Sequence, residues 1–172
     1  MRFRFLSMFA AVALIAACET APEDSGSSSG TGGGTTTTTT TTAPAPQGPA
    51  PGSQEDLVVN IGDRVFFDFD KYNLKADARN TLEQQAAWLA KYPAVSIIVE
   101  GHCDERGTRE YNLALGERRA NSVKDYLVAL GVAPNRIRTI SYGKERPVAL
   151  GSNESAWAQN RRGVTVVSGA GS

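Results

Sequence analysis

The sequence predicts an α/β fold, a two-layer sandwich in which helices cover one face of a mixed β-sheet. Some segments have alternating apolar and polar residues, as half-buried strands do. Between them lie segments whose apolar residues recur with helical periodicity. The expected order is βαβαβαβ, with strands at 63–69, 95–100, 137–142 and 164–167 and helices at 75–91, 109–130 and 153–160. This regular alternation favours a layered α/β domain.

Residues 1–17 have the composition of a secretory signal peptide. Arg2 and Arg4 supply a positive start, and the apolar stretch at 5–17 is too short to span a bilayer. Cys18 follows Ile-Ala-Ala, which resembles a bacterial lipobox. We therefore expect Cys18 to carry a covalent lipid and to begin the mature chain. The alternative is an ordinary leader followed by a chance cysteine.

A disordered linker is predicted after the lipidated cysteine, so that the two together occupy residues 18–56. The segment is rich in Thr, Pro, Gly and Ser, and it contains no large apolar residue that a core could bury. A flexible chain of this length has a root-mean-square span of about 35 Å and a fully stretched reach of about 130 Å. The folded domain is expected at 57–168, with a flexible tail at 169–172.

The first strand and helix of the domain follow from two local patterns. Residues 63–69 alternate and are rich in aromatic side chains, which favours a strand. The helix at 75–91 ends before Pro93, and its inner face is formed by Ala78, Leu82, Gln85, Ala86 and Leu89.

The second strand and the long helix after it have clearer patterns. Val95, Ile97 and Val99 share one face of an extended chain, so that face is expected to be buried. The core-facing stripe of the helix is formed by residues at i, i+3, i+4 and i+7, namely Val123, Tyr126, Leu127 and Leu130. Gly131 and Pro134 then end the helix.

Polar side chains that suit a small zwitterion gather between this strand and this helix. Asp104 follows the strand, and Asn112 and Arg119 lie seven residues apart on one line of the helix, about 10 Å along its axis. Gly116 lies between them, and a glycine there costs about 0.8–1 kcal/mol relative to alanine. We expect it to leave a slot in the helix face. A carboxylate, an arginine and a helix N-terminus match a ligand with an ammonium beside a carboxylate.

The plain alternative is that Asp104 and Arg119 are solvated or paired with each other, as such residues near a helix start usually are. If the binding hypothesis holds, Arg119→Ala should abolish binding while the domain stays folded. Arg119→Lys should also weaken binding, because an ammonium cannot make the two-pronged contact of a guanidinium.

The same segment resembles the peptidoglycan-binding motif of OmpA-like C-terminal domains. Its residues here are Asp104, Leu115, Gly116, Arg119, Ala120 and Val123. The words GHCDERGTREYNLALGERRAN, SYGKERP and NRR narrow the resemblance to the peptidoglycan-associated lipoproteins of the Tol–Pal system, over about residues 61–167. Two positions differ from that family, because Cys103 stands where Ala or Thr is expected and Arg109 stands where Pro is expected.

The resemblance implies the same two-layer fold and a non-covalent peptidoglycan-binding site. It implies that Asp104 and Arg119 grip the free amino-acid end of meso-diaminopimelate in the stem peptide. It also implies that Phe69 and Asp70, in the loop after the first strand, form another wall of the pocket. The alternative for these two is a core phenylalanine and an aspartate that caps a turn or helix.

The resemblance also implies partners and a location. The partners would be peptidoglycan, the outer membrane through the lipid, and TolB with other Tol–Pal components. Glu19 follows Cys18 and is not the aspartate that retains such lipoproteins in the inner membrane, so the periplasmic face of the outer membrane is expected. The implied role is to link the outer membrane to the wall and to support its constriction at cell division.

Other functions receive less support from the sequence. The 18 basic and 18 acidic residues balance, which argues against nucleic acid as a partner. His102 and Cys103 could form a nucleophile pair, but neighbours in a strand point to opposite faces. With Asp104 they lack the second ligand cluster that a metal site needs. No enzyme activity and no cofactor besides the lipid on Cys18 are expected.

Two rival hypotheses remain beside the Tol–Pal assignment. One is an OmpA-like lipoprotein outside the Tol system, and the other is a wall-active enzyme that uses the same pocket. The family signature NRR includes Arg161 and Arg162. One of these is expected to make a structural pair and the other to contact ligand, and the sequence does not distinguish them.

Overall fold

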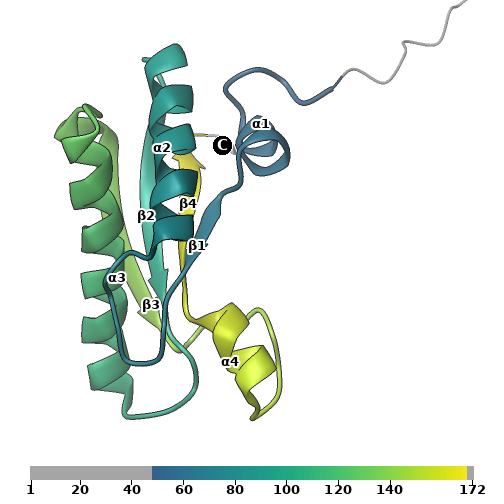
Figure 1. Cartoon of the computed structure of the whole chain (residues 1–172), viewed down its shortest axis with the longest axis vertical. Coiled ribbons are helices and arrows are strands. Elements are labelled where there is room, and N and C mark those ends of the chain that lie inside the picture. The colour runs from purple at the N-terminus through teal and green to yellow at the C-terminus, as the bar shows by residue number, and fades with distance from the viewer. Residues whose placement is uncertain (1–47, 170–172) are drawn as a thin grey trace, which may run out of the picture. The chain divides into compact units, whose positions relative to one another are not determined.

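A computed structural model describes residues 48–169, which fold around a four-stranded sheet. The strands are β1 (Arg64–Phe66), β2 (Ser96–His102), β3 (Ile137–Gly143) and β4 (Arg162–Ser168). Their order is β1-β4-β2-β3, so the last strand of the chain lies between the first two (Figure 1). β2 and β3 are parallel, whereas β4 is antiparallel to both of its neighbours. The predicted α/β fold with a mixed sheet is confirmed.

Two long helices cover one face of this sheet, as expected (Figure 1). They are α2 (Ala76–Lys91) and α3 (Arg109–Ala129). The short helix α4 (Glu154–Asn160) precedes β4, and the 3-10 helix η1 (Pro134–Arg136) precedes β3. β1 has three residues and is shorter than predicted, although Phe67 N–H still donates to the O of Arg161 just before β4. Among residues 48–169, no helix is both long and apolar enough to cross a membrane.

The N-terminal side of the domain differs from the sequence prediction. The signal peptide expected at 1–17 and the lipidation site Cys18 lie outside the described residues. Helix α1 (Gln54–Asn60) was not predicted, and the expected boundary between linker and domain, after residue 56, falls inside it. The Ser53 side chain caps α1, and Leu57 is 1% exposed in the core. The seven-residue helix was missed because it follows a Pro- and Gly-rich stretch.

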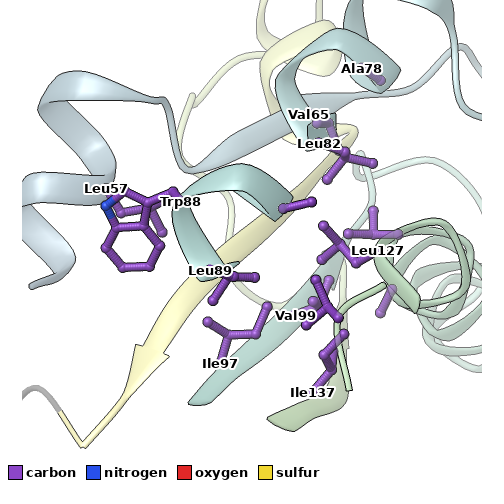
Figure 2. Packing of buried hydrophobic residues seen from close by; sticks show 14 of the residues in the cluster. Leu57, Val65, Ala78, Leu82, Trp88, Leu89, Ile97, Val99, Leu127 and Ile137 are labelled. Atoms are coloured by element: carbon purple, nitrogen blue, oxygen red, sulfur yellow. The ribbon is translucent and has the colours of Figure 1, made fainter. Parts of the chain in front are cut away.

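The core lies between β2 and the helices that cover it, as Figure 2 shows. Leu82 and Leu89 of α2, Ile97 and Val99 of β2, and Leu127 of α3 are each no more than 1% exposed. Burying one such side chain contributes about 1.5–3 kcal/mol. These contacts, rather than helix propensity, hold the two layers together.

The long helix α3 packs unusually close to β2 because two glycines meet. A Cβ added to Gly101 would lie 1.8 Å from Gly116 O, and one added to Gly116 would lie 2.3 Å from Ser141 Oγ. The predicted ligand slot at Gly116 is therefore wrong, since the missing side chain makes room for the strand. The predicted stripe is also corrected at its end, where Leu130 is 40% exposed.

Candidate functional site

A cavity of about 160 Å³ opens where the loop after β1, the loop after β2 and the first half of α3 meet. All five residues predicted to bind ligand line it, namely Phe69, Asp70, Asp104, Asn112 and Arg119. The other lining residues are Cys103, Arg106, Gly107, Tyr111 and Leu115. Tyr111, Leu115 and Arg119 are spaced four residues apart on α3. A helical projection from Arg119 could therefore have added Tyr111 and Leu115 to the predicted site.

Arg119 is completely buried and holds the loops of the site together. Its Nε donates to Lys71 O at 2.8 Å, Nη1 to His102 O at 2.8 Å and Nη2 to Asp68 O at 3.1 Å. Burial lowers the pKa of its guanidinium from the ordinary value. Because a guanidinium has five N–H donors, one N–H on each terminal nitrogen remains for another acceptor. The Cys103 thiol, which also lines the cavity, is a further hydrogen-bond partner of this side chain.

Asp104 is 4% exposed and lies between two arginines other than Arg119. Its Oδ2 accepts from Arg106 Nη2 at 2.6 Å and from Arg161 Nη1 at 3.3 Å. Its Oδ1 accepts from the backbone N–H and from Nε of Arg106. Burial acts to raise the pKa of Asp104, but the hydrogen bonds from Arg106 outweigh it and lower that pKa. Asp104 is therefore a charged and already occupied carboxylate.

Asn112 fixes the loop that carries Asp104 to the start of α3. Its Nδ2 donates to Arg106 O at 2.7 Å and to Thr108 O at 3.0 Å. Thr108 is the N-cap of α3 and accepts from the N–H of Tyr111. Because both N–H groups of the Asn112 amide are used, a ligand would meet its oxygen, which is an acceptor.

The opposite wall is formed by Phe69 and Asp70 in the loop after β1. Phe69 is 57% exposed, so the alternative of a core phenylalanine is wrong. Asp70 has a positive φ of 56°, which few residues other than glycine adopt, and its carboxylate accepts from the hydroxyl of Tyr111. Asp70 therefore supplies the cavity with an exposed carboxylate that is joined to α3 through Tyr111.

The neighbouring Cys103 and His102 have different surroundings. Cys103 lines the cavity, and burial raises the pKa of its thiol to about 11. The His102 ring stacks on Tyr142, and its Nε2 lies 3.3 Å from Glu100. Burial, with Arg162 and Arg146 nearby, lowers its pKa to about 4. Neither side chain is an activated nucleophile or its base.

Both arginines of the NRR signature make hydrogen bonds within the protein. Arg161 is buried, donates to Phe67 O and pairs with Asp104 and Glu154. Arg162 is also buried and donates to Asn160 O and Arg146 O. Neither arginine lines the cavity, so the ligand contact expected of one of them stays a prediction. No cluster of three potential metal ligands occurs within residues 48–169.

The lining of the cavity thus combines a guanidinium from Arg119, an amide from Asn112 and the carboxylates of Asp70 and Asp104. A comparison with protein-family models matches residues 66–161 to the model described as the OmpA family. The chain belongs to the OmpA family. The resemblance predicted from the segment 104–123 is confirmed, and the matched range contains every residue that lines the cavity.

Curated OmpA-family relatives match most of the described residues. The "Peptidoglycan-associated lipoprotein" of Rhizobium meliloti is 65% identical over 122 residues, which cover 71% of this chain and 69% of that protein. The protein of the same name from Brucella melitensis is 60% identical over 121 residues, or 70% of this chain and 72% of that protein. These names describe a lipoprotein and not a catalyst, in agreement with the expectation of no enzyme activity.

Solved structures of related proteins have the same OmpA-like fold. The peptidoglycan-associated lipoprotein from Burkholderia pseudomallei aligns with a TM-score of 0.60 and 46% identity, covering 62% of this chain and 90% of that chain. The C-terminal domain of Helicobacter pylori MotB aligns with a TM-score of 0.58 and 27% identity, covering 62% and 84%.

Proposed function

We propose that this chain is a lipid-anchored outer-membrane protein whose domain binds peptidoglycan non-covalently in the cavity around Arg119. The observation that carries the proposal is the convergence of Asp104, Asn112 and Arg119 on one cavity, in a chain 65% identical to a protein named peptidoglycan-associated lipoprotein. The lipid would be carried by Cys18, and the chain up to α1 would set the distance between membrane and domain.

The ligand we propose is the free amino-acid end of meso-diaminopimelate in the stem peptide. Its carboxylate would accept from the guanidinium of Arg119. Its ammonium would be held by carboxylates at the cavity wall, Asp104 and Asp70, and by the amide oxygen of Asn112. The cavity of about 160 Å³ is close to the roughly 150 Å³ that holds benzene, so it suits an amino-acid head group and not a disaccharide.

The sacculus is the test substrate for this proposal. The full chain, purified in detergent, would be sedimented with isolated sacculi that contain diaminopimelate. Wild type should pellet, and Asp104→Asn should stay in solution. Asp77→Asn is the matched control, since Asp77 lies exposed in the first turn of α2 and outside the cavity. Equal pelleting of wild type and Asp104→Asn would show that the cavity is not the wall-binding site.

Membership of the Tol–Pal system is a further part of the proposal. It is supported by the SYGKERP and NRR words in the sequence and by relatives that bear the name of its lipoprotein. In that system the chain would also bind TolB and take part in outer-membrane constriction at division. The competing hypothesis is an OmpA-family lipoprotein outside the Tol system. Capture of purified TolB by the full chain would support the Tol–Pal role, and its absence would support the alternative.

A further inference from the structure

The carboxylate of Asp104 is already paired with the side chain of Arg106. Arg106 supplies three of its four hydrogen bonds, from the backbone N–H, from Nε and from Nη2, and Arg161 supplies the fourth. An ionised carboxylate accepts about four hydrogen bonds. An ammonium that enters the cavity therefore finds no free acceptor position on Asp104 while Arg106 stays in place.

Arg106 and Arg161, which both pair with Asp104, differ in how firmly the rest of the protein holds them. The Arg161 side chain is 7% exposed and is also held by Phe67 O and Glu154. The Arg106 side chain is 30% exposed, and it lines the cavity. Arg106 is therefore the cation that can move toward solvent or toward a ligand.

Aromatic rings hold the Arg106 guanidinium over Asp104. Its Cζ lies 4.0 Å from the ring centre of Phe69 and 4.0 Å from the ring centre of Trp157. Phe69 belongs to the loop after β1 and Trp157 to α4, so the guanidinium links two separate elements across the mouth of the site. The Trp157 indole is itself fixed by a hydrogen bond to Glu105 at 2.9 Å.

We propose that Arg106 is a specificity-determining residue that competes with the ligand cation for Asp104. A zwitterion displaces the guanidinium from Asp104 with its ammonium and offers its own carboxylate to the released guanidinium. A plain amine also has to displace Arg106, but it gives the guanidinium no new partner. Arg106 therefore selects ligands that carry both charges. This inference rests on the proposed function, because it concerns the same cavity.

The test compares two probes of equal amine spacing. They are meso-diaminopimelate and 1,5-diaminopentane, which is the same molecule without its two carboxylates. Their dissociation constants would be measured by calorimetry on the full chain in detergent, for wild type and for Arg106→Met. Methionine keeps an unbranched side chain between the rings and removes the charge. Arg138→Met, on the exposed start of β3 outside the cavity, is the matched control for the lost charge.

The expected result is a change in selectivity. If Arg106 occupies Asp104 about nine-tenths of the time, the apparent affinity for a competing cation falls about tenfold. On that estimate, Arg106→Met should bind the diamine about tenfold more tightly than wild type. Binding of diaminopimelate should change far less, and the preference for it should fall about tenfold. A residue with only a structural role would weaken both probes alike and leave the ratio unchanged.

Other outcomes would overturn the inference in distinguishable ways. If wild type binds diaminopimelate and Arg106→Met keeps the same ratio of affinities, the competition by Arg106 is refuted and the proposed function stands. If no variant binds diaminopimelate, the proposed function fails together with the inference. A variant Trp157→Leu, which loosens the guanidinium without removing it, should shift the ratio in the same direction. No shift in either variant would refute the role of Arg106.

Discussion

Arg119 shows most clearly how one residue combines structure and binding in this domain. Two carbonyl oxygens of the loop after β1 and one at the end of β2 accept its N–H groups, and the side chain is fully buried. A mutation therefore affects more than a ligand contact, because it leaves buried carbonyls without donors. The sequence-based expectation that Arg119→Ala stays folded does not fit these contacts.

Arg119→Ala is predicted to destabilise the domain by about 3–5 kcal/mol, since it removes one partner of several buried hydrogen bonds. Urea unfolding followed by circular dichroism would measure the loss. Arg118→Ala is the control, because Arg118 is the exposed neighbour on the same helix and only contacts the Tyr72 ring at 5.7 Å. Equal stability of the two variants would contradict the structural role of Arg119.

His102 is predicted to make the domain less stable in mild acid. Its folded pKa is about 4, below the roughly 6.5 of an unfolded histidine, so the unfolded state binds more protons between these values. The stabilisation is present above pH 6.5 and is lost as pH falls toward 4. The expected loss between pH 7 and pH 5 is about 2 kcal/mol.

The measurement for His102 is urea unfolding at several pH values, compared with His102→Gln. His102 is the only histidine of the chain, so the variant isolates its contribution. Burial raises the pKa of the adjacent Glu100 and acts in the opposite direction. The variant should show a flatter pH dependence than wild type, and parallel curves would refute the prediction.

At the level of elements, the closest contact is the one between α3 and β2. Gly101→Ala would place a Cβ 1.8 Å from the backbone oxygen of Gly116, which no side-chain movement can relieve. The expected cost is about 3 kcal/mol or more, measured by thermal or urea unfolding. Gly48→Ala is the matched control, because its added Cβ meets nothing within 4 Å. A stable Gly101→Ala domain would show that the two elements can separate.

Helix α1 is predicted to be part of the cooperative fold although it lies at the N-terminal edge of the domain. Leu57→Ala should cost about 2–4 kcal/mol, because Leu57 is buried in the main core. Val59→Ala lies on the same helix at a position 64% exposed and should be nearly neutral. If both variants unfold like wild type, α1 does not contribute to the stability of the domain.

At the level of the whole molecule, the linker predicted to precede the domain sets the reach of the proposed anchor. Deleting residues 25–47 leaves about 12 residues before α1, which span about 40 Å at most. Cross-linking to peptidoglycan in cells should fall, while thermal unfolding of the purified chain stays unchanged. Replacing the same residues by a Gly/Ser sequence of equal length should restore cross-linking. Unchanged cross-linking after deletion would refute the reach argument.

The sequence was most informative where one local pattern decided the structure. The bounds of α2 and α3 follow from periodicity. The placement of Asn112 and Arg119 follows from helical spacing, and that of Asp104 from its position just after the second strand. The partners of these residues could not be predicted in the same way. Arg161 and Trp157 reach the site through contacts between distant segments, and no spacing along the chain encodes those contacts. Arg106 lies only two residues after Asp104, and its side chain pairs with it through the local turn. For the same reason as with Arg161 and Trp157, the sequence does not show that the space beside Gly116 is filled by Gly101 of β2 and is not open to a ligand.

The central position of β4 has a consequence for how the chain folds. β1 pairs only with β4, so the Val65–Gly163 pair joins residues almost a hundred positions apart. A chain that emerges N-terminus first therefore holds β1 and one edge of β2 without partners until its last strand appears. Such non-local pairing makes folding slower than in a helical bundle of the same size. During that interval the unpaired edges are open to aggregation.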